Sequence, residues 1–147
     1  MRRPPKPTFF TDRDLGNIIP DMLEDAGYSV ERHDSHFGPT TPDLNWLRQV
    51  GINGWVALTR DKRIRYSSDS LQMTLRAGIP LFVLVGNTTH DILALNLVQT
   101  MPRVIDFLGK HQTPFVAKIY RPTPVDAVFK GDSGRVEMWV SWTDETD

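Results

Sequence analysis

Residues 81–85 read Leu-Phe-Val-Leu-Val, without a polar side chain. A strand that is covered on both faces has this continuous apolar character, and such strands are typical of parallel sheets with helices on either side. Two shorter apolar runs, at residues 8–11 and 55–59, also have the composition of strands. These three segments together predict a central, mostly parallel sheet.

Between these strands the apolar residues change to helical spacing. Residues 15–26 and 43–50 each place apolar side chains on one face, and Gly27 and Gly51 are expected to end those helices. Strands that alternate with helices predict right-handed βαβ units and an α/β fold, with a C-terminal hairpin at one edge of the sheet. The other expected elements are a strand at 28–32, polar loops at 33–41 and 61–68, a helix at 69–76, a long helix from 88 with a second segment from Pro102 to 110, and strands at 115–120, 125–129 and 136–142.

The composition is that of an ordinary folded chain. At 147 residues, 39% hydrophobic and 24% charged, the sequence predicts a single domain over residues 8–142, with a flexible basic arm at 1–7 and an acidic tail at 143–147. The formal net charge of −1 gives no overall field that would favour nucleic acid. Any site for a polyanion must therefore depend on a local cluster of basic residues.

Several classes of protein are excluded or disfavoured by what the sequence lacks. It has no cysteine, which excludes disulfides and thiolate metal sites and fits a reducing compartment such as the cytoplasm. No apolar run approaches the roughly 18 residues of a membrane-spanning helix, and no apolar segment follows the basic start as in a secretory signal. The glycine motifs of nucleotide sites and of serine hydrolases do not occur.

Three aspartates occupy positions that can converge. Asp12 and Asp61 come just after expected strands, and Asp43 opens an expected helix. The carboxyl ends of parallel strands face one side of an α/β sheet, where ligands bind. Carboxylate oxygens are the ligands that Mg²⁺ prefers, and few of them are needed. The sequence therefore predicts a divalent-metal site formed by these three side chains.

Each aspartate also has a purely structural interpretation. An aspartate after a strand often forms an Asx turn, and Asp43 after Thr-Pro is well placed to cap a helix. Asp14 is a candidate fourth carboxylate and could equally cap the first helix. It is the combination of the three in this order that favours a site.

A basic cluster surrounds Asp61. Arg60, Lys62, Arg63 and Arg65 lie within six residues, and Arg13 follows Asp12. A run of charge is often only a solvated loop, but beside a metal site it would bind the phosphates of a polyanion largely independently of sequence. Tyr66 could stack on a base or could simply pack. The two loop histidines, His33 and His36, lack a third metal partner and are expected at the surface.

Three stretches together resemble the PIN-like domains of bacterial toxin ribonucleases, in the VapC-related branch with a T-x-D-K signature. They are residues 9–16 (FFTDRDLG), 41–47 (TPDLNWL) and 54–65 (GWVALTRDKRIR), and the resemblance extends over about residues 8–120. It implies a three-layer α/β/α domain, RNA cleavage that depends on Mg²⁺ or Mn²⁺, and inhibition by a cognate antitoxin. Separately from the resemblance, a homodimer is an expectation because small α/β domains with apolar edge helices often pair.

Residue by residue, the resemblance implies that Asp12, Asp43 and Asp61 are the catalytic, metal-binding carboxylates. Better-known members carry four acids, including a glutamate in the helical region, and here Asp14 is the candidate for the fourth. Thr59 would orient the segment around Asp61. The residues expected at the RNA substrate are Arg13, Thr59, Lys62, Arg63 and Arg65.

Two other functions compete with a nuclease. A non-catalytic PIN-like module that binds RNA or protein would explain a missing fourth acid. A phosphoacceptor receiver domain also uses aspartates on a parallel sheet, but it needs an acidic pair at the first strand, and Asp12-Arg13-Asp14 does not match that pair. The receiver interpretation is therefore disfavoured.

Overall fold

The protein is described by a computed structural model that covers residues 6–141, apart from the side chains of Arg65 and Val125. The expected acidic tail, and all of the expected basic arm except residues 6 and 7, lie outside this range. The described chain forms one six-stranded sheet in the order β2-β1-β3-β4-β5-β6. The strands are β1 (Thr8–Thr11), β2 (Ser29–Arg32), β3 (Val56–Thr59), β4 (Pro80–Leu84), β5 (Phe115–Tyr120) and β6 (Arg135–Ser141).

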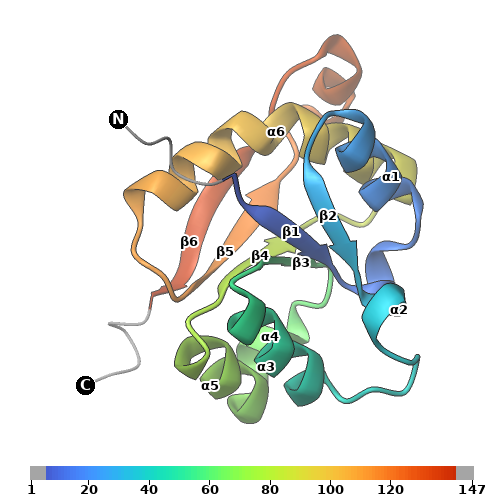
Figure 1. The fold of residues 1–147 in the computed structure, drawn as a ribbon. Helices are drawn as coiled ribbons and strands as arrows, with labels where there is room; N and C mark the ends of the chain where they lie inside the picture. The colour runs from blue at the N-terminus through green and yellow to red at the C-terminus, as the bar shows by residue number, and fades with distance from the viewer. Residues whose placement is uncertain (1–5, 142–147) are drawn as a thin grey trace, which may run out of the picture.

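The first five strands run parallel and only β6 is antiparallel, at the edge beside β5. This confirms the expected α/β class with a mostly parallel sheet. Parallel pairing brings the carboxyl ends of β1, β3 and β4 to the same edge, as Figure 1 shows for β1 and β3. Because Asp12 follows β1 and Asp61 follows β3, the topology places both aspartates along that edge.

Helices cover the two faces of the sheet and give a three-layer α/β/α arrangement (Figure 1). On one face lie α1 (Ile18–Asp25) and the long α6 (His90–Lys110), which pack against each other. On the other face lie α3 (Asp43–Asn53), α4 (Arg63–Tyr66) and α5 (Ser68–Arg76). Three short helical segments complete the described chain: η1 (Arg13–Leu15), α2 (His33–His36) and η2 (Val125–Lys130).

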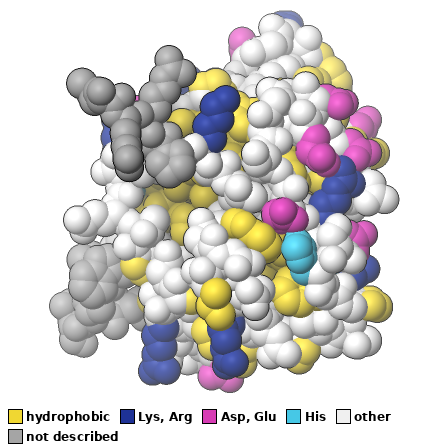
Figure 2. Space-filling view, in the orientation of Figure 1, with side chains coloured by type: hydrophobic (Ala, Val, Ile, Leu, Met, Phe, Trp, Pro, Cys, Tyr) yellow, Lys and Arg dark blue, Asp and Glu magenta, His cyan; other side chains and the backbone are white. Residues whose placement is uncertain are grey.

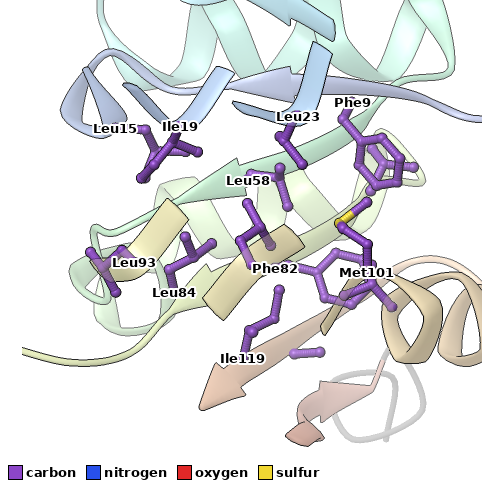
Figure 3. Close-up of a cluster of buried hydrophobic side chains, with 14 of the residues drawn as sticks. Phe9, Leu15, Ile19, Leu23, Leu58, Phe82, Leu84, Leu93, Met101 and Ile119 are labelled. Atoms are coloured by element: carbon purple, nitrogen blue, oxygen red, sulfur yellow. The ribbon is translucent and has the colours of Figure 1, made fainter. Parts of the chain in front are cut away.

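Alternating side chains of the strands supply two separate cores. Phe9, Leu58 and Phe82 point to the α1/α6 face and meet Leu23 and Met101, as the close-up in Figure 3 shows. Their neighbours in sequence point to the α3/α5 face. That second core contains Phe10, Trp46, Leu47, Val50, Ala57, Ile64, Leu71, Leu81, Val83 and Val116. The apolar run is thus buried on both faces over residues 81–84, as its composition predicts, and Val85 is half-buried.

Gly51 lies inside α3 and does not end it, contrary to the sequence-based expectation. A Cβ atom at this position would come 2.5 Å from the Cβ of Ala77, so the glycine allows α3 to approach the end of α5. The helix ends instead at Gly54, whose φ of 69° is in the left-handed region that glycine tolerates best. Close packing against Ala77, and not the end of a helix, therefore accounts for the glycine at position 51.

Four other expected elements differ from the structure. Pro102 does not begin a second helix but lies within α6, whose buried side chains on both sides of it continue one face. Residues 125–129, expected as a strand, form the 3-10 helix η2 after Pro124. The two polar loops each contain one helical turn, α2 and α4. None of the helices within residues 6–141 has the length and apolar character needed to cross a membrane.

Candidate functional site

A buried threonine joins the acidic residues at the strand ends. Thr59, the last residue of β3, is fully buried, and its Oγ1 lies 2.8 Å from Oδ2 of Asp12 and 3.1 Å from Oδ2 of Asp14. The single hydroxyl proton is therefore shared between two carboxylates from the segment after β1. One side chain thus ties the end of β3 to the end of β1.

Backbone groups fix the same two carboxylates. Asp12 continues the sheet, because its backbone N–H donates to the carbonyl of Leu58, and its side chain accepts from the N–H of Arg13 at 2.7 Å. The carboxylate of Asp14 accepts from the backbone N–H of Arg60 at 3.2 Å. Asp14 therefore bridges to β3 and does not cap α1, whose N-cap residue is Asn17.

The pair is electrostatically costly. Burial raises the pKa of Asp12 to about 7, and the charges of Asp14 and, to a smaller extent, Asp43 also raise it. Burial likewise raises the pKa of Asp14, against the hydrogen bonds from Arg60 and Thr59, and the charge of Asp61 adds to that rise. Four aspartates thus share one electrostatic environment, and a cation placed among them would relieve their mutual repulsion.

Asp61 is placed as expected but its carboxylate is held by a neighbour. Its backbone N–H donates to Oγ1 of Thr59 at 3.0 Å, which agrees with the predicted orienting role of Thr59. Its Oδ1 accepts from both the backbone N–H and the Nε of Arg63, at 3.0 and 2.9 Å. These bonds lower the pKa of Asp61. The contact to the backbone of Arg63 is also an Asx turn, so the structural interpretation holds as well.

Asp43 is the first residue of α3, as expected. Its Oδ1 accepts from the indole Nε1–H of Trp46, one turn further along the helix, at 2.9 Å. It is not the N-cap residue, because that position is Pro42. The charge of the Asp43 carboxylate nevertheless raises the pKa of Asp12, although less than burial and Asp14 do.

The donor set suits a hard divalent cation, since it consists of carboxylate oxygens. Among residues 6–141, however, no three His, Asp or Glu side chains stand close enough together to hold a metal ion as they are. The structure brings Asp12 and Asp14 together through Thr59, whereas Arg63 and Trp46 hold the carboxylates of Asp61 and Asp43. A third ligand would require one of these held side chains to change rotamer.

The basic residues fall into two groups. Arg60 was predicted to bind phosphates, but its guanidinium is already engaged. Its Nη2 donates to the carbonyls of Gly86 and Thr88 at 3.1 and 3.3 Å. Arg13 donates to His33 and to the carbonyl of Phe37. Lys62 and Arg63 are exposed at the site, although Arg63 pairs with Asp61. The side chain of Arg65 lies outside the described part of the chain.

Two expected roles need correction. Thr59 was expected at the substrate, but its fully buried side chain contacts the carboxylates and cannot touch RNA in this arrangement. His33 was expected at the surface, but it is buried beneath Phe37, and burial lowers its pKa. His36 is half-exposed and lies 2.8 Å from Glu31, consistent with a surface role.

The structure contains a hollow, lined in part by Arg60 and Lys62, that the sequence does not predict. It has a volume of about 470 Å³ and lies at the carboxyl end of β4, between Lys62 and Asn87. No sequence signal singled out Asn87, which lies in the turn between β4 and α6. The surface over α1 and β2 carries acidic and basic side chains side by side (Figure 2), because Arg32 pairs there with Asp21 and Glu24.

Comparisons with known proteins agree with this geometry. A family model described as "PIN like domain" matches residues 7–86. This segment includes the four aspartates of the candidate site, Asp12, Asp14, Asp43 and Asp61. A protein of Mycobacterium tuberculosis described as "Putative ribonuclease VapC45" is 31% identical over 78 residues, which are 50% of this chain and 56% of that protein. The chain thus matches only about half the length of this curated relative. No solved structure matches the chain significantly.

Proposed function

Because the chain belongs to the PIN-like domain family, we propose that it is a divalent-metal-dependent endoribonuclease that hydrolyses phosphodiester bonds of RNA. The observation that carries the proposal is the pair of carboxylates, Asp12 and Asp14, held together by the hydroxyl of Thr59 at the strand ends. The similarity to a protein described as a ribonuclease supports the choice of RNA.

In this proposal Asp12 and Asp14 hold Mg²⁺ or Mn²⁺, together with Asp61 or Asp43 after the side chain turns. Bound there, the ion would activate water for attack on the phosphate and offset the negative charge of the RNA. Thr59 positions the carboxylates from behind, in the way that outer hydrogen bonds orient metal ligands. Lys62 and Arg63, exposed beside the acids, bind the neighbouring phosphates of the strand.

The same family argument extends to the biological context. Since the similar protein carries the name VapC45, we propose that this chain is the toxin of a toxin–antitoxin pair, acts in the cytoplasm and is inhibited by a cognate antitoxin. A homodimer remains part of this proposal. The test is co-purification with the product of a neighbouring gene, which should block cleavage when added back.

The activity itself is tested with purified protein and single-stranded RNA. Wild type should cleave the RNA with Mg²⁺ or Mn²⁺ and not with EDTA. The Asp12→Asn and Asp61→Asn variants should fold but lose cleavage, while the exposed control Asp132→Asn keeps it. If the two site variants cleave as fast as wild type, the assignment fails.

A second function is favoured by one observation, that no three acidic or histidine side chains within residues 6–141 already form a metal site. A non-catalytic PIN-like module would bind RNA or protein on the same surface. RNA binding that persists in EDTA, with no cleavage under any divalent ion, would support this module over the nuclease.

A further inference from the structure

The hollow at the carboxyl end of β4 contains one residue that links the candidate site to β5. Val83 of β4 is part of its lining, and it is in register with Thr59 on one side and with Lys118 of β5 on the other. Neighbouring strands lie about 4.8 Å apart, so Lys118 is about 10 Å from Thr59 along this row. The row therefore leads from the residue that holds the carboxylates to a cation on β5.

A second group of side chains lies at the far end of that row. The Nζ of Lys118 is 3.8 Å from the centre of the Trp139 ring of β6, and the ring of Tyr66 meets Trp139 edge-on with the ring centres 5.7 Å apart. We call these three residues the aromatic platform. Tyr66 is 73% exposed although it is a large aromatic side chain.

The aromatic platform lies at the β5–β6 end of the sheet, on its α3/α5 face. On the α3/α5 face, Val116 of β5 and Val140 of β6 are buried in the second core and Trp139 packs against it, whereas Tyr66 of α4 stays exposed. A second cation–aromatic contact lies on the same two strands, where Arg135 is 4.2 Å from the ring of Tyr120. Exposed rings beside cations are the elements from which single-stranded nucleic-acid surfaces are built.

We propose that the aromatic platform and Lys62 bind single-stranded RNA next to the acidic residues. An unpaired base would stack on Tyr66 and Trp139, and phosphates would lie at the ammonium groups of Lys118 and Lys62. This inference rests on the proposed function and adds its substrate class, because a base within a duplex has no free face to stack on a side chain.

Continuity with the candidate site supports RNA as the occupant. Tyr66 ends α4, the short helix that begins two residues after Asp61. Lys62, which lines the hollow at the end of β4, stands in the chain between Asp61 and Tyr66, so it links the two groups of residues. The ammonium groups of Lys118 and Lys62 match the negative charge of a phosphate backbone. Glu137, which is in register with Lys118, forms an ion pair with Arg135.

The experiment measures binding in EDTA, which separates it from cleavage. A labelled single-stranded RNA of about 12 nucleotides, within the range of known single-strand sites, is compared with a duplex of the same sequence by fluorescence anisotropy. The variants are Tyr66→Ala and Lys118→Gln. The matched controls are Phe129→Ala, a ring that is 66% exposed, and Lys130→Gln, an exposed lysine, both on η2.

Wild type should prefer the single strand. Tyr66→Ala should weaken binding by about 5- to 100-fold, the loss expected for one stacked base. Lys118→Gln should weaken binding and make the salt dependence shallower by about 0.7 in log–log slope, as for one lost phosphate contact on a single strand. The two controls should bind like wild type.

The outcomes distinguish this inference from the proposed function. If wild type cleaves RNA but both platform variants bind and cleave as wild type does, the platform is overturned and the nuclease stands. If wild type never cleaves but the platform variants lose single-strand binding, the platform stands and the nuclease fails. Equal affinity for duplex, no RNA binding, or binding only to a protein partner would overturn the platform.

Discussion

The Oγ1 of Thr59 lies 2.8 Å from Oδ2 of Asp12, although the two residues are 47 positions apart in sequence. The same hydroxyl reaches Asp14 and accepts the backbone N–H of Asp61. Thr59 is thus the common partner of three acidic residues, and it is fully buried. We propose that Thr59 positions the carboxylates, and this can be tested without changing any of the aspartates.

Replacing Thr59 by valine removes the hydroxyl and keeps the shape of the side chain. The carboxylates of Asp12 and Asp14 then lose a donor and the N–H of Asp61 loses an acceptor. Loss of such an outer hydrogen bond typically lowers metal affinity or activity by about 10- to 100-fold. Unsatisfied buried groups should also lower the free energy of unfolding by about 1–3 kcal/mol.

Initial rates of RNA cleavage and urea denaturation would measure the two effects of Thr59→Val. Thr59→Ser, which keeps the hydroxyl, is the matched control and should recover most of the rate. Equal rates in the valine and serine variants would show that the hydroxyl has no positioning role.

Divalent ions should stabilise the fold through the carboxylates. An ion that binds only the folded protein adds about 2.7 kcal/mol at a concentration one hundred times its Kd, which raises Tm by several degrees in a protein of this size. Thermal unfolding with and without Mn²⁺ should show this rise for wild type and for Asp132→Asn. An undiminished rise in the double variant Asp12→Asn, Asp14→Asn would place the ion elsewhere.

Stability should depend on pH in a particular direction. The pKa of Asp12 is about 7 in the folded protein against 3.8 for an ordinary aspartate, so the folded state holds this proton more tightly. The contribution of Asp12 is therefore favourable below about pH 4 and is lost as the pH rises through 7. In EDTA, Tm should fall between pH 5 and pH 8, and it should fall less in Asp12→Asn. Calorimetry at several pH values that gave the same fall in both proteins would contradict this origin.

The packing of α3 against α5 predicts opposite effects of two glycine substitutions. Gly51→Ala places a Cβ atom 2.5 Å from that of Ala77 and should destabilise the fold by about 1–3 kcal/mol. Gly109→Ala, in the last turn of α6 with open space around it, should be neutral or stabilising by up to about 1 kcal/mol. Denaturant midpoints of the two variants test this, and a Gly51→Ala midpoint at or above that of Gly109→Ala would refute it.

Much of the fold could be predicted from the sequence because two-sided burial leaves a direct mark on composition. Residues 81–84 alternate between the two cores, so all four are apolar, and parallel pairing follows from the helices between strands. Elements that depend on distant packing could not be predicted. Gly51 is explained only by its contact with Ala77, and the helix around Pro102 continues because its flanking side chains are buried.

In the candidate site, too, some features could be predicted from the sequence and others depend on tertiary packing. The positions of Asp12, Asp43 and Asp61 follow from strand ends and a helix start, which the sequence marks. The hydrogen bonds that hold Asp61 to Arg63, and Arg60 to the turn at Gly86, depend on rotamers and on where β4 ends. The hollow beside Asn87 arises only when β3 and β4 lie side by side.

The central claim is that side chains from separate strands coordinate one divalent ion, and anomalous scattering from a Mn²⁺-soaked crystal tests it most directly. The account predicts a manganese peak between Asp12 and Asp14 at carboxylate-oxygen distances of about 2.0–2.2 Å, with Asp61 or Asp43 turned towards it. Saturating manganese with no peak near Asp12 and Asp14, in a crystal whose carboxylates are open to solvent, would contradict it.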